Sequence, residues 1–137
     1  MGSQVWFSYA AVHETGRERS LPVEIYCDMN RLPWEKHPTV RDVSIQKVIT
    51  QARFGSESPS ILMVKIPSGV EVPEHIHERS EDILCILSGR GTMWIDGIGD
   101  IAMHQGVVIR VPRNTRHRIF DVTDDLLVYD VFSPGIM

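Results

Sequence analysis

Two histidines and two acids lie close together in one short stretch of the chain. His75 and His77 are separated by a single residue, and Glu81 and Asp82 follow four and five residues after His77. In an extended strand, side chains two residues apart point to the same face, so both imidazoles would project together. Imidazole nitrogens and carboxylate oxygens are common ligands of divalent metals. The two histidines therefore predict half of a metal chelate, and one of the two acids would supply a further ligand.

A third histidine lies in a second stretch that is also marked by turn residues. Gly69 precedes the first two histidines, and Gly89 follows the acids. Gly106 and Pro112 precede His117 in the sequence GVVIRVPRNTRHRIFD. Because glycine and proline mark turns, His117 is expected to enter a strand that follows a turn. From there it could reach the other histidines across neighbouring strands.

The elements that would hold these residues are strands. Short runs of β-branched and large apolar residues alternate with turn residues, at intervals typical of an all-β domain. They predict strands at residues 43–50, 60–66, 82–89, 91–96, 106–112, 117–122 and 126–132. The pair Asp96-Gly97 predicts a hairpin, because both residues accept a positive φ at low cost.

Length and composition indicate one globular domain. The chain has 137 residues, of which 42% are hydrophobic and 23% charged, as is usual in soluble proteins. No apolar run approaches the ~20 residues of a membrane span, and no basic residue precedes the short apolar stretch near the N-terminus. We therefore expect a cytoplasmic protein without membrane contact. The net charge of −4 argues against a general affinity for nucleic acid.

The first part of the chain is less regular than the rest. Residues 1–39 are expected to form an N-terminal extension, an edge strand at 4–12 plus an irregular segment, that packs on a barrel formed by residues 40–137. An apolar edge strand on a small barrel often pairs with a second subunit, so we expect a homodimer. Cys27 and Cys85 are too few and too far apart for a disulfide framework or a zinc knuckle, and are expected to be reduced thiols.

The stretch around the first two histidines resembles the first motif of the cupin superfamily. That motif is a glycine, five residues, H-x-H, three or four residues, a glutamate, six residues and a glycine. Its positions are matched here by Gly69, His75, His77, one of the two acids, and Gly89.

The second stretch resembles the second cupin motif in its spacing throughout. That motif is a glycine, five residues, P-x-G, two residues, a histidine, three residues and an asparagine. Gly106, Pro112 and His117 match it in residue type. Asn114 stands in place of the glycine, a mild change because asparagine tolerates a positive φ, and Asp121 stands in place of the asparagine.

The resemblance covers roughly residues 40–132 and implies a fold and a cofactor. The fold would be the cupin jelly-roll, an antiparallel β-barrel also called a double-stranded β-helix. One divalent metal per chain would be held inside it by His75, His77, His117 and one carboxylate, with water or substrate in the remaining positions.

The carboxylate could be either acid. Glu81 has the residue type of the motif, whereas Asp82 leaves the required six residues before Gly89. Only one of the two neighbours can face inward, since successive side chains of a strand alternate. We favour Asp82, because the register of a buried strand is costly to shift. The acid could instead orient a ligand histidine, or the metal could keep three histidines and extra waters.

Other candidate residues have simpler interpretations. His13, His37 and His104 are expected to be partly exposed histidines, although His37 could approach the mouth of the barrel. Four arginines close to His117 could attract an anionic ligand or could simply be solvated: Arg110, Arg113, Arg116 and Arg118.

Three classes of function are compatible with such a site. The ligands suit Fe(II), Mn(II), Ni(II), Zn(II) or Cu(II), and apolar side chains could shelter a small organic substrate: Ile76, Leu84, Ile86, Met63 and Trp94. We favour an enzyme, either a dioxygenase or an isomerase, lyase or cyclase in which Glu81 or Asp82 shuttles a proton. A ligand-binding or sensing module is the alternative, but the chain carries no second domain for it to act on. A structural domain with a vestigial site is disfavoured, because both motifs are present.

Overall fold

The structure is a computed structural model that describes residues 23–137 of the chain. The edge strand expected at residues 4–12, with the homodimer contact assigned to it, and His13 lie outside the described residues. The division at residue 40 stays a prediction.

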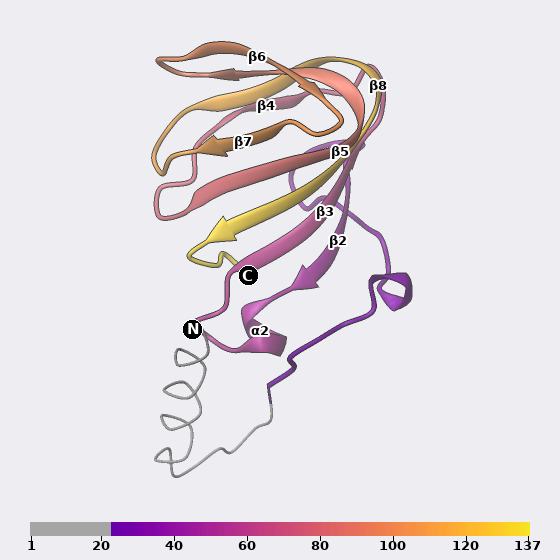
Figure 1. Ribbon diagram of the computed structural model, residues 1–137, viewed down its shortest axis with the longest axis vertical. Coiled ribbons are helices and arrows are strands. Elements are labelled where there is room, and N and C mark those ends of the chain that lie inside the picture. The colour runs from indigo at the N-terminus through magenta and orange to yellow at the C-terminus, as the bar shows by residue number, and fades with distance from the viewer. Residues whose placement is uncertain (1–22) are drawn as a thin grey trace, which may run out of the picture.

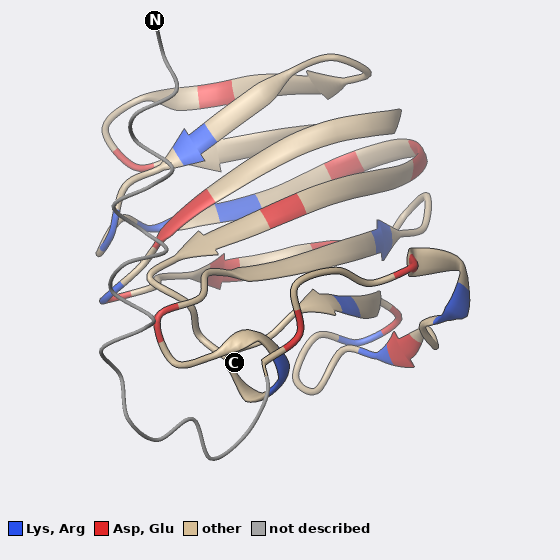
Figure 2. Cartoon of the chain, turned by 60° about the horizontal axis from the view of Figure 1, so that its bottom comes forward, with Lys and Arg blue, Asp and Glu red and all other residues tan. Residues whose placement is uncertain are grey.

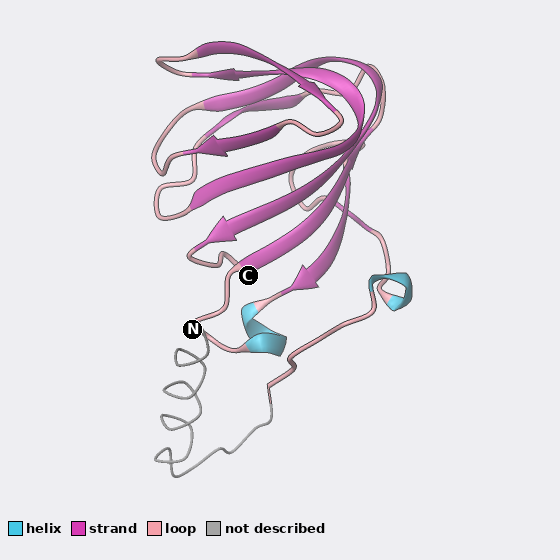
Figure 3. Ribbon diagram, viewed as in Figure 1, coloured by secondary structure: helices cyan, strands magenta, loops and turns pink. Residues whose placement is uncertain are grey.

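Strands dominate the described part of the chain (Figures 1 and 3). The elements, in chain order, are η1 Met29–Arg31, β1 Glu35–Lys36, β2 Ser44–Ile49, α2 Gln51–Phe54, β3 Ser60–Ile66, β4 Val72–His75, β5 Glu81–Ile95, β6 Gly99–His104, β7 Val108–Val111 and β8 His117–Ser133. Among these residues, the helical segments have three and four residues, so neither could span a membrane.

Two long, bent strands hold the fold together. The first part of β5 pairs with β7 and with the end of β8, and its second part pairs with β6 and with the start of β8. In turn, β8 pairs with β4 near its start and with β3 towards its end. All of these pairs are antiparallel. Because the two parts of β5 pair with different strands, and those of β8 do as well, each of these long strands runs through both walls of a jelly-roll. The expected all-β jelly-roll class is confirmed.

The bends change which residues face the core. In β5 the buried positions are even-numbered up to Ile86 and odd-numbered from Met93 onward. In β8 they change from odd to even between Ile119 and Val122. Irregular pairing between Ile86 and Thr92 accounts for the change in β5, because an extra residue shifts the alternation of a strand.

The expected strands were therefore divided wrongly in two places. Residues 82–89 and 91–96 belong to one strand, β5, and residues 117–122 and 126–132 belong to β8. Glycine and aspartate at these points make bulges and bends rather than turns. Three further strands, β1, β4 and β6, were not expected. β1 has only two residues, both exposed, β4 contains a proline and mostly unburied residues, and β6 has only a short apolar pattern. The hairpin at Asp96-Gly97 is confirmed, with Gly97 at φ +83° between β5 and β6.

The segment before β2 packs against the barrel. The side-chain amide of Gln46 donates hydrogen bonds to the carbonyl oxygens of Met29 (2.7 Å) and Leu32 (3.0 Å). The ammonium group of Lys65 lies 3.9 Å from the centre of the Trp34 ring. Basic and acidic segments are interspersed over the described part of the chain in Figure 2.

Candidate metal centre

The strand pairing brings distant histidines together. His75 ends β4 and lies directly opposite His117, the first residue of β8. His77 follows in the loop after β4, and its carbonyl oxygen accepts a hydrogen bond from the backbone N–H of Asn114 (2.7 Å). Asn114 has a positive φ of +56°, a conformation that glycine adopts easily, and it stands where the second cupin motif has a glycine. Asp82 is the second residue of β5 and is buried.

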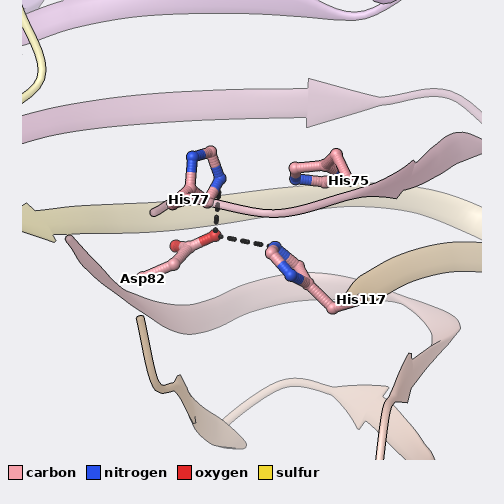
Figure 4. A group of neighbouring side chains, drawn as sticks. All are labelled: His75, His77, Asp82 and His117. Carbon is pink, nitrogen blue, oxygen red and sulfur yellow. Dashed lines mark ion pairs between the residues drawn. The ribbon is translucent and has the colours of Figure 1, made fainter. Parts of the chain in front are cut away.

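These four side chains form one compact group. Each offers a nitrogen or oxygen atom, and the four atoms lie within 4.8 Å of one another. Figure 4 shows the rings of His77 and His117 on either side of the Asp82 carboxylate. Its Oδ2 atom lies 3.7 Å from Nε2 of His77 and 3.4 Å from Nε2 of His117.

Backbone carbonyl groups fix the tautomers of two of the histidines. Nδ1 of His75 lies 2.7 Å from the carbonyl oxygen of Pro73, and Nδ1 of His117 lies 2.9 Å from that of Thr115. A carbonyl oxygen only accepts, so both Nδ1 atoms carry the proton and both neutral rings present a bare Nε2 lone pair. This is the arrangement in which a histidine ligates a metal through Nε2. Nε2 of His117 is buried without a hydrogen-bond partner.

The electrostatics favour the neutral form of two of the imidazoles, those of His75 and His77. Burial lowers the pKa of His75 and that of His77 below the ordinary histidine value, and it outweighs the opposite effect of the Asp82 charge. A metal binds only the neutral form of imidazole, so the lowered pKa values favour ligation at neutral pH.

A second buried acid, Asp130, adjoins Asp82. Asp130 lies opposite Leu84 in the β5–β8 pairing, so it shares a face with Asp82. Burial and the charge of Asp82 raise the pKa of Asp130 well above the ordinary value. Burial alone would raise the pKa of Asp82, but Asp130 and the His117 and His77 rings lower it. Of the two acids, Asp130 therefore holds a proton more tightly, and the ionised form is favoured at Asp82.

The group fits a divalent metal ion. Two ligand atoms that are each about 2.1 Å from a tetrahedral ion lie roughly 3.4 Å apart, close to the separations of Asp82 from the two rings. The buried atoms without a partner include Nε2 of His117 and Oδ1 of Asp82, and a cation would satisfy such lone pairs. Three neutral imidazoles and one carboxylate suit Fe(II), Mn(II), Ni(II), Zn(II) and Cu(II) alike.

The chain can now be compared with known proteins. Residues 62–132 match the family model described as "Cupin domain". The chain belongs to the cupin family. No curated protein matches this cupin in sequence.

Solved structures of several cupin-like proteins are similar to this cupin in fold. A predicted oxalate decarboxylase from Thermotoga maritima is 21% identical, with a TM-score of 0.68 over 79% of this chain and 97% of that one. Ectoine synthase from P. lautus is 12% identical, with a TM-score of 0.71 over 83% and 80%. The polyketide cyclase RemF from Streptomyces resistomycificus is 17% identical, with a TM-score of 0.66 over 80% and 78%. At these identities the likeness shows the fold alone.

The group of three histidines and Asp82 in this cupin opens into a cavity of about 440 Å³. Of the apolar side chains expected to line it, Ile76 and Leu84 do so. Met63, Ile86 and Trp94 do not. Further apolar residues complete the wall: Val40, Val43, Ile45, Leu62, Val64, Ile66, Val72, Met93, Ile119, Val128 and Phe132. The site is therefore a mostly apolar chamber with its polar groups gathered around the histidines.

Glu81 lies outside the group and outside the wall of the cavity. Its carboxylate forms an ion pair with the guanidinium of Arg110 on the opposite face of the sheet. The structure thus brings Asp82, and not Glu81, to the three histidines, as strand alternation requires for adjacent residues.

The arginines close to His117 also point away from the cavity. Arg110 pairs with Glu81, and Arg118 lies over the Phe120 ring at 4.3 Å from its centre. Arg113 and Arg116 are exposed, and none of the four lines the cavity. The solvated interpretation therefore fits them, and they give no support to an anionic substrate.

Four polar residues of the cavity wall were not singled out from the sequence as part of the site: His37, Thr39, Glu74 and Asp130. Asp130 lies in a strand that the sequence did predict, but only its pairing with β5 puts it beside Asp82. His37 lies in the irregular segment before β2, where no spacing indicates a partner. Glu74 precedes His75 directly and belongs to a strand that was not expected.

Proposed function

We propose that this cupin is a metal-dependent enzyme that acts on a small organic molecule inside the barrel. A divalent ion would be held by His75, His77, Asp82 and His117. The observation that carries the proposal is the pair of bare Nε2 atoms, fixed by backbone carbonyl groups, beside an ionised and buried carboxylate. Such an arrangement is costly without a cation, because buried polar atoms are left unsatisfied.

The ion would supply Lewis acidity toward a substrate oxygen or, if it is redox-active, a site for O₂. The protein would supply the remaining functions. Its apolar wall excludes water, which strengthens polar interactions with a bound substrate. Asp130 keeps its proton and so leaves Asp82 as the charged group of the pair.

Acid–base roles need groups that can reach the substrate. The proton-shuttling roles expected for Glu81 and Asp82 stay predictions, and the geometry supports them unequally. Glu81 does not line the cavity, whereas Asp82 and the exposed Glu74 do. We therefore assign proton transfer to Asp82 or Glu74 rather than to Glu81.

The fold likeness suggests which reactions to assay first. The names of the similar structures include a predicted oxalate decarboxylase, a DMSP lyase and a polyketide cyclase. A site of three histidines and one carboxylate can support lyase and cyclase reactions on oxygen-bearing molecules, and it can also support dioxygenase reactions. Fold alone does not decide among them.

The first experiment is metal analysis of the purified protein and of two variants, after exposure to each of the five candidate ions. We expect about one ion per chain in the wild type and in His104→Ala, whose ring is exposed and outside the group. We expect loss of the ion in His117→Ala. Equal loading of all three proteins would place the metal elsewhere and contradict the proposal.

Turnover assays then separate an enzyme from a binding module. Consumption of O₂ that depends on iron, manganese, nickel or copper would indicate a dioxygenase. Conversion without O₂, including with zinc, would indicate a lyase, isomerase or cyclase. A protein that binds metal and small carboxylates without converting any of them would instead be the non-catalytic ligand-binding cupin.

A further inference from the structure

His37 approaches the candidate metal centre from outside the barrel strands. It lies in the loop between β1 and β2, just after the pair formed by Lys36 and Ser44. Its backbone N–H donates to the carbonyl oxygen of Val43 (2.8 Å), which closes the loop. Its side chain lines the cavity together with Thr39 and Val40. The ring is therefore held at the cavity wall by the local backbone.

The backbone fixes the tautomer of His37 in the opposite sense to the metal-binding histidines. Nδ1 of His37 accepts hydrogen bonds from the backbone N–H of Val40 (2.9 Å) and that of Thr39 (3.1 Å). A backbone N–H can only donate, so Nδ1 of His37 carries no proton. In the neutral ring the proton must then be on Nε2. His75 and His117, whose Nδ1 atoms face carbonyl oxygens, have the reverse arrangement.

His37 is also held in the neutral form. Burial, and then the neighbouring His75, lower the pKa of His37 below its ordinary value. Within the described residues no hydrogen bond engages its Nε2 atom. An Nε2–H group has no lone pair in the ring plane to offer a metal, but it can donate one hydrogen bond to a ligand.

The other residues of the cavity wall indicate which kind of ligand would accept a hydrogen bond from the Nε2–H group of His37. No lysine or arginine of the described residues lines the cavity, and its acids are Glu74, Asp82 and Asp130. Apart from the candidate metal ligands and the carboxyl group of Asp130 beside them, His37 and the hydroxyl of Thr39 are the neutral side-chain donors of the wall. A ligand with an acceptor oxygen would therefore find its hydrogen bond at the end of the cavity that these two residues form.

We propose that His37 is a positioning residue, whose Nε2–H donates to a carboxylate or carbonyl oxygen of the substrate and which does not bind the metal. The inference rests on the proposed function, because the same molecule would also reach the ion. The substrate class is thereby narrowed to small molecules that carry an acceptor oxygen besides the one that meets the metal.

The tautomer can be measured directly, without substrate or metal. Nitrogen-15 NMR of the histidine rings in the metal-free protein at pH 7.5 distinguishes Nδ1–H from Nε2–H, and His37→Gln assigns the signal. We expect Nε2–H for His37 and Nδ1–H for His75 and His117. On loading with zinc, the signals of His75 and His117 should move as ligands do. A protonated Nδ1 in His37, or a ligand-type shift of its Nε2, would overturn the proposal.

Binding of small carboxylates tests the role of the donor. Oxalate, pyruvate and 2-oxoglutarate serve as probes of the zinc-loaded protein in calorimetry. We expect His37→Ala to weaken the tightest of them about tenfold, the effect of one hydrogen bond to a charged group, with zinc stoichiometry unchanged. His37→Gln should restore affinity to within about threefold, because its amide oxygen can accept from the backbone and its N–H can replace Nε2–H. His104→Ala is the matched control and should match the wild type.

The outcomes separate the inference from the proposed function. Equal affinity in the wild type and His37→Ala, or no binding of any probe by zinc-loaded protein, would overturn the role of His37 while leaving the metal site intact. Failure of the wild type to bind zinc or any other of the five candidate ions would contradict the proposed function instead. In that case the tautomer measured in the metal-free protein would still decide the assignment of His37.

Discussion

The histidines that line the cavity of this cupin differ in the backbone group that contacts the Nδ1 atom of the ring. A carbonyl two residues earlier in the chain faces Nδ1 of His75 and of His117. Backbone N–H groups two and three residues later face Nδ1 of His37. The residue type is the same, but the Nε2 atom carries a lone pair in His75 and His117, whereas in His37 it carries a proton that it can donate. Local backbone geometry thus decides which histidines suit a cation.

The two adjacent acids should differ sharply in their effect on metal affinity. Asp82→Asn removes the charge nearest the histidines and should weaken zinc binding about 100-fold, whereas Glu81→Gln should leave it unchanged. Zinc titration against a competing chelator measures both constants. Equal weakening by the two changes, or weakening by Glu81→Gln alone, would show that Asp82 is not the ligand.

Asp130 should make the metal-free protein less stable as the pH rises. Its pKa is raised in the folded state, so above the ordinary value of about 3.9 the unfolded chain releases a proton that the folded chain keeps, and unfolding is favoured. Asp130→Asn removes this penalty. The variant should gain stability over the wild type by on the order of 1 kcal/mol per pH unit above pH 4, until the folded carboxyl group ionises.

Urea unfolding at intervals from pH 4.5 to 7.5 measures that difference. Asp96→Asn is the control, because it makes the same change of residue type at an exposed position in the hairpin. A difference between wild type and Asp130→Asn that stays constant with pH would mean that Asp130 is ionised in the folded protein.

Part of the site could be predicted from residue spacing. The spacing of the cupin motif, with six residues between the acid and Gly89, favours Asp82 over Glu81, and the structure places Asp82 in the group; its binding of a metal stays a prediction. Asp130 and His37 could not be found in this way. They reach the cavity through strand pairing and through a loop, and neither leaves a periodic signal in the sequence.

At the scale of the elements, the bend of β5 depends on close contact between two backbones. Gly89 has φ +94°, and a Cβ atom placed on it would lie 2.1 Å from the carbonyl oxygen of Asp125 in β8. Only glycine therefore lets the two strands stay paired through the bend.

Gly89→Ala should accordingly be far more harmful than a glycine substitution in the hairpin. We expect a loss of about 3 kcal/mol or more in the free energy of unfolding, from strain and from the backbone clash. Gly97→Ala is the matched control, because Gly97 has a similar φ of +83° but nothing within 4 Å of its added Cβ, and it should lose about 1 kcal/mol. Urea unfolding of both variants measures the two losses in the free energy of unfolding. Equal losses would show that the backbone at Asp125 moves away from the added Cβ atom at little cost.

The class of the fold could be predicted from the sequence, but its strand boundaries could not. Alternation and turn residues indicate an all-β domain, and the motifs add the jelly-roll. A glycine can end a strand or bend it, and at Gly89 the choice is made by the pairing of β5 with β8, which is not a local property. For the same reason the aspartates at 121 and 124–125 mark a bend in β8 rather than a turn between strands.

At the scale of the whole molecule, the candidate metal ligands lie on three strands and on the loop that follows one of them. His75 belongs to β4, His77 to the loop after it, Asp82 to β5 and His117 to β8. An ion held by all four would therefore connect both walls of the jelly-roll. Binding to the folded chain alone raises the free energy of unfolding.

Zinc should thus stabilise the wild type and not the variant that lacks two ligands. At a zinc concentration 100 times the dissociation constant, the free energy of unfolding should rise by about 2.7 kcal/mol. His75→Ala combined with His77→Ala should show no such rise. Urea unfolding with and without zinc, in both proteins, measures it; the same rise in the double variant would locate the bound zinc at another site.

The position of β8 has a consequence for how the molecule forms during synthesis. β3, β4 and β5 all precede β8 and all pair with it, over registers as distant as Ser60 with Phe132. A nascent chain that has left the ribosome only as far as β6 holds His75, His77 and Asp82 but not the strand that unites them. Contacts so distant in sequence are slow to form, on the order of milliseconds to seconds for comparable β topologies. The four candidate ligands can therefore come together only after β8 has paired with β4 and β5, and any ion bound earlier would be held by an incomplete set.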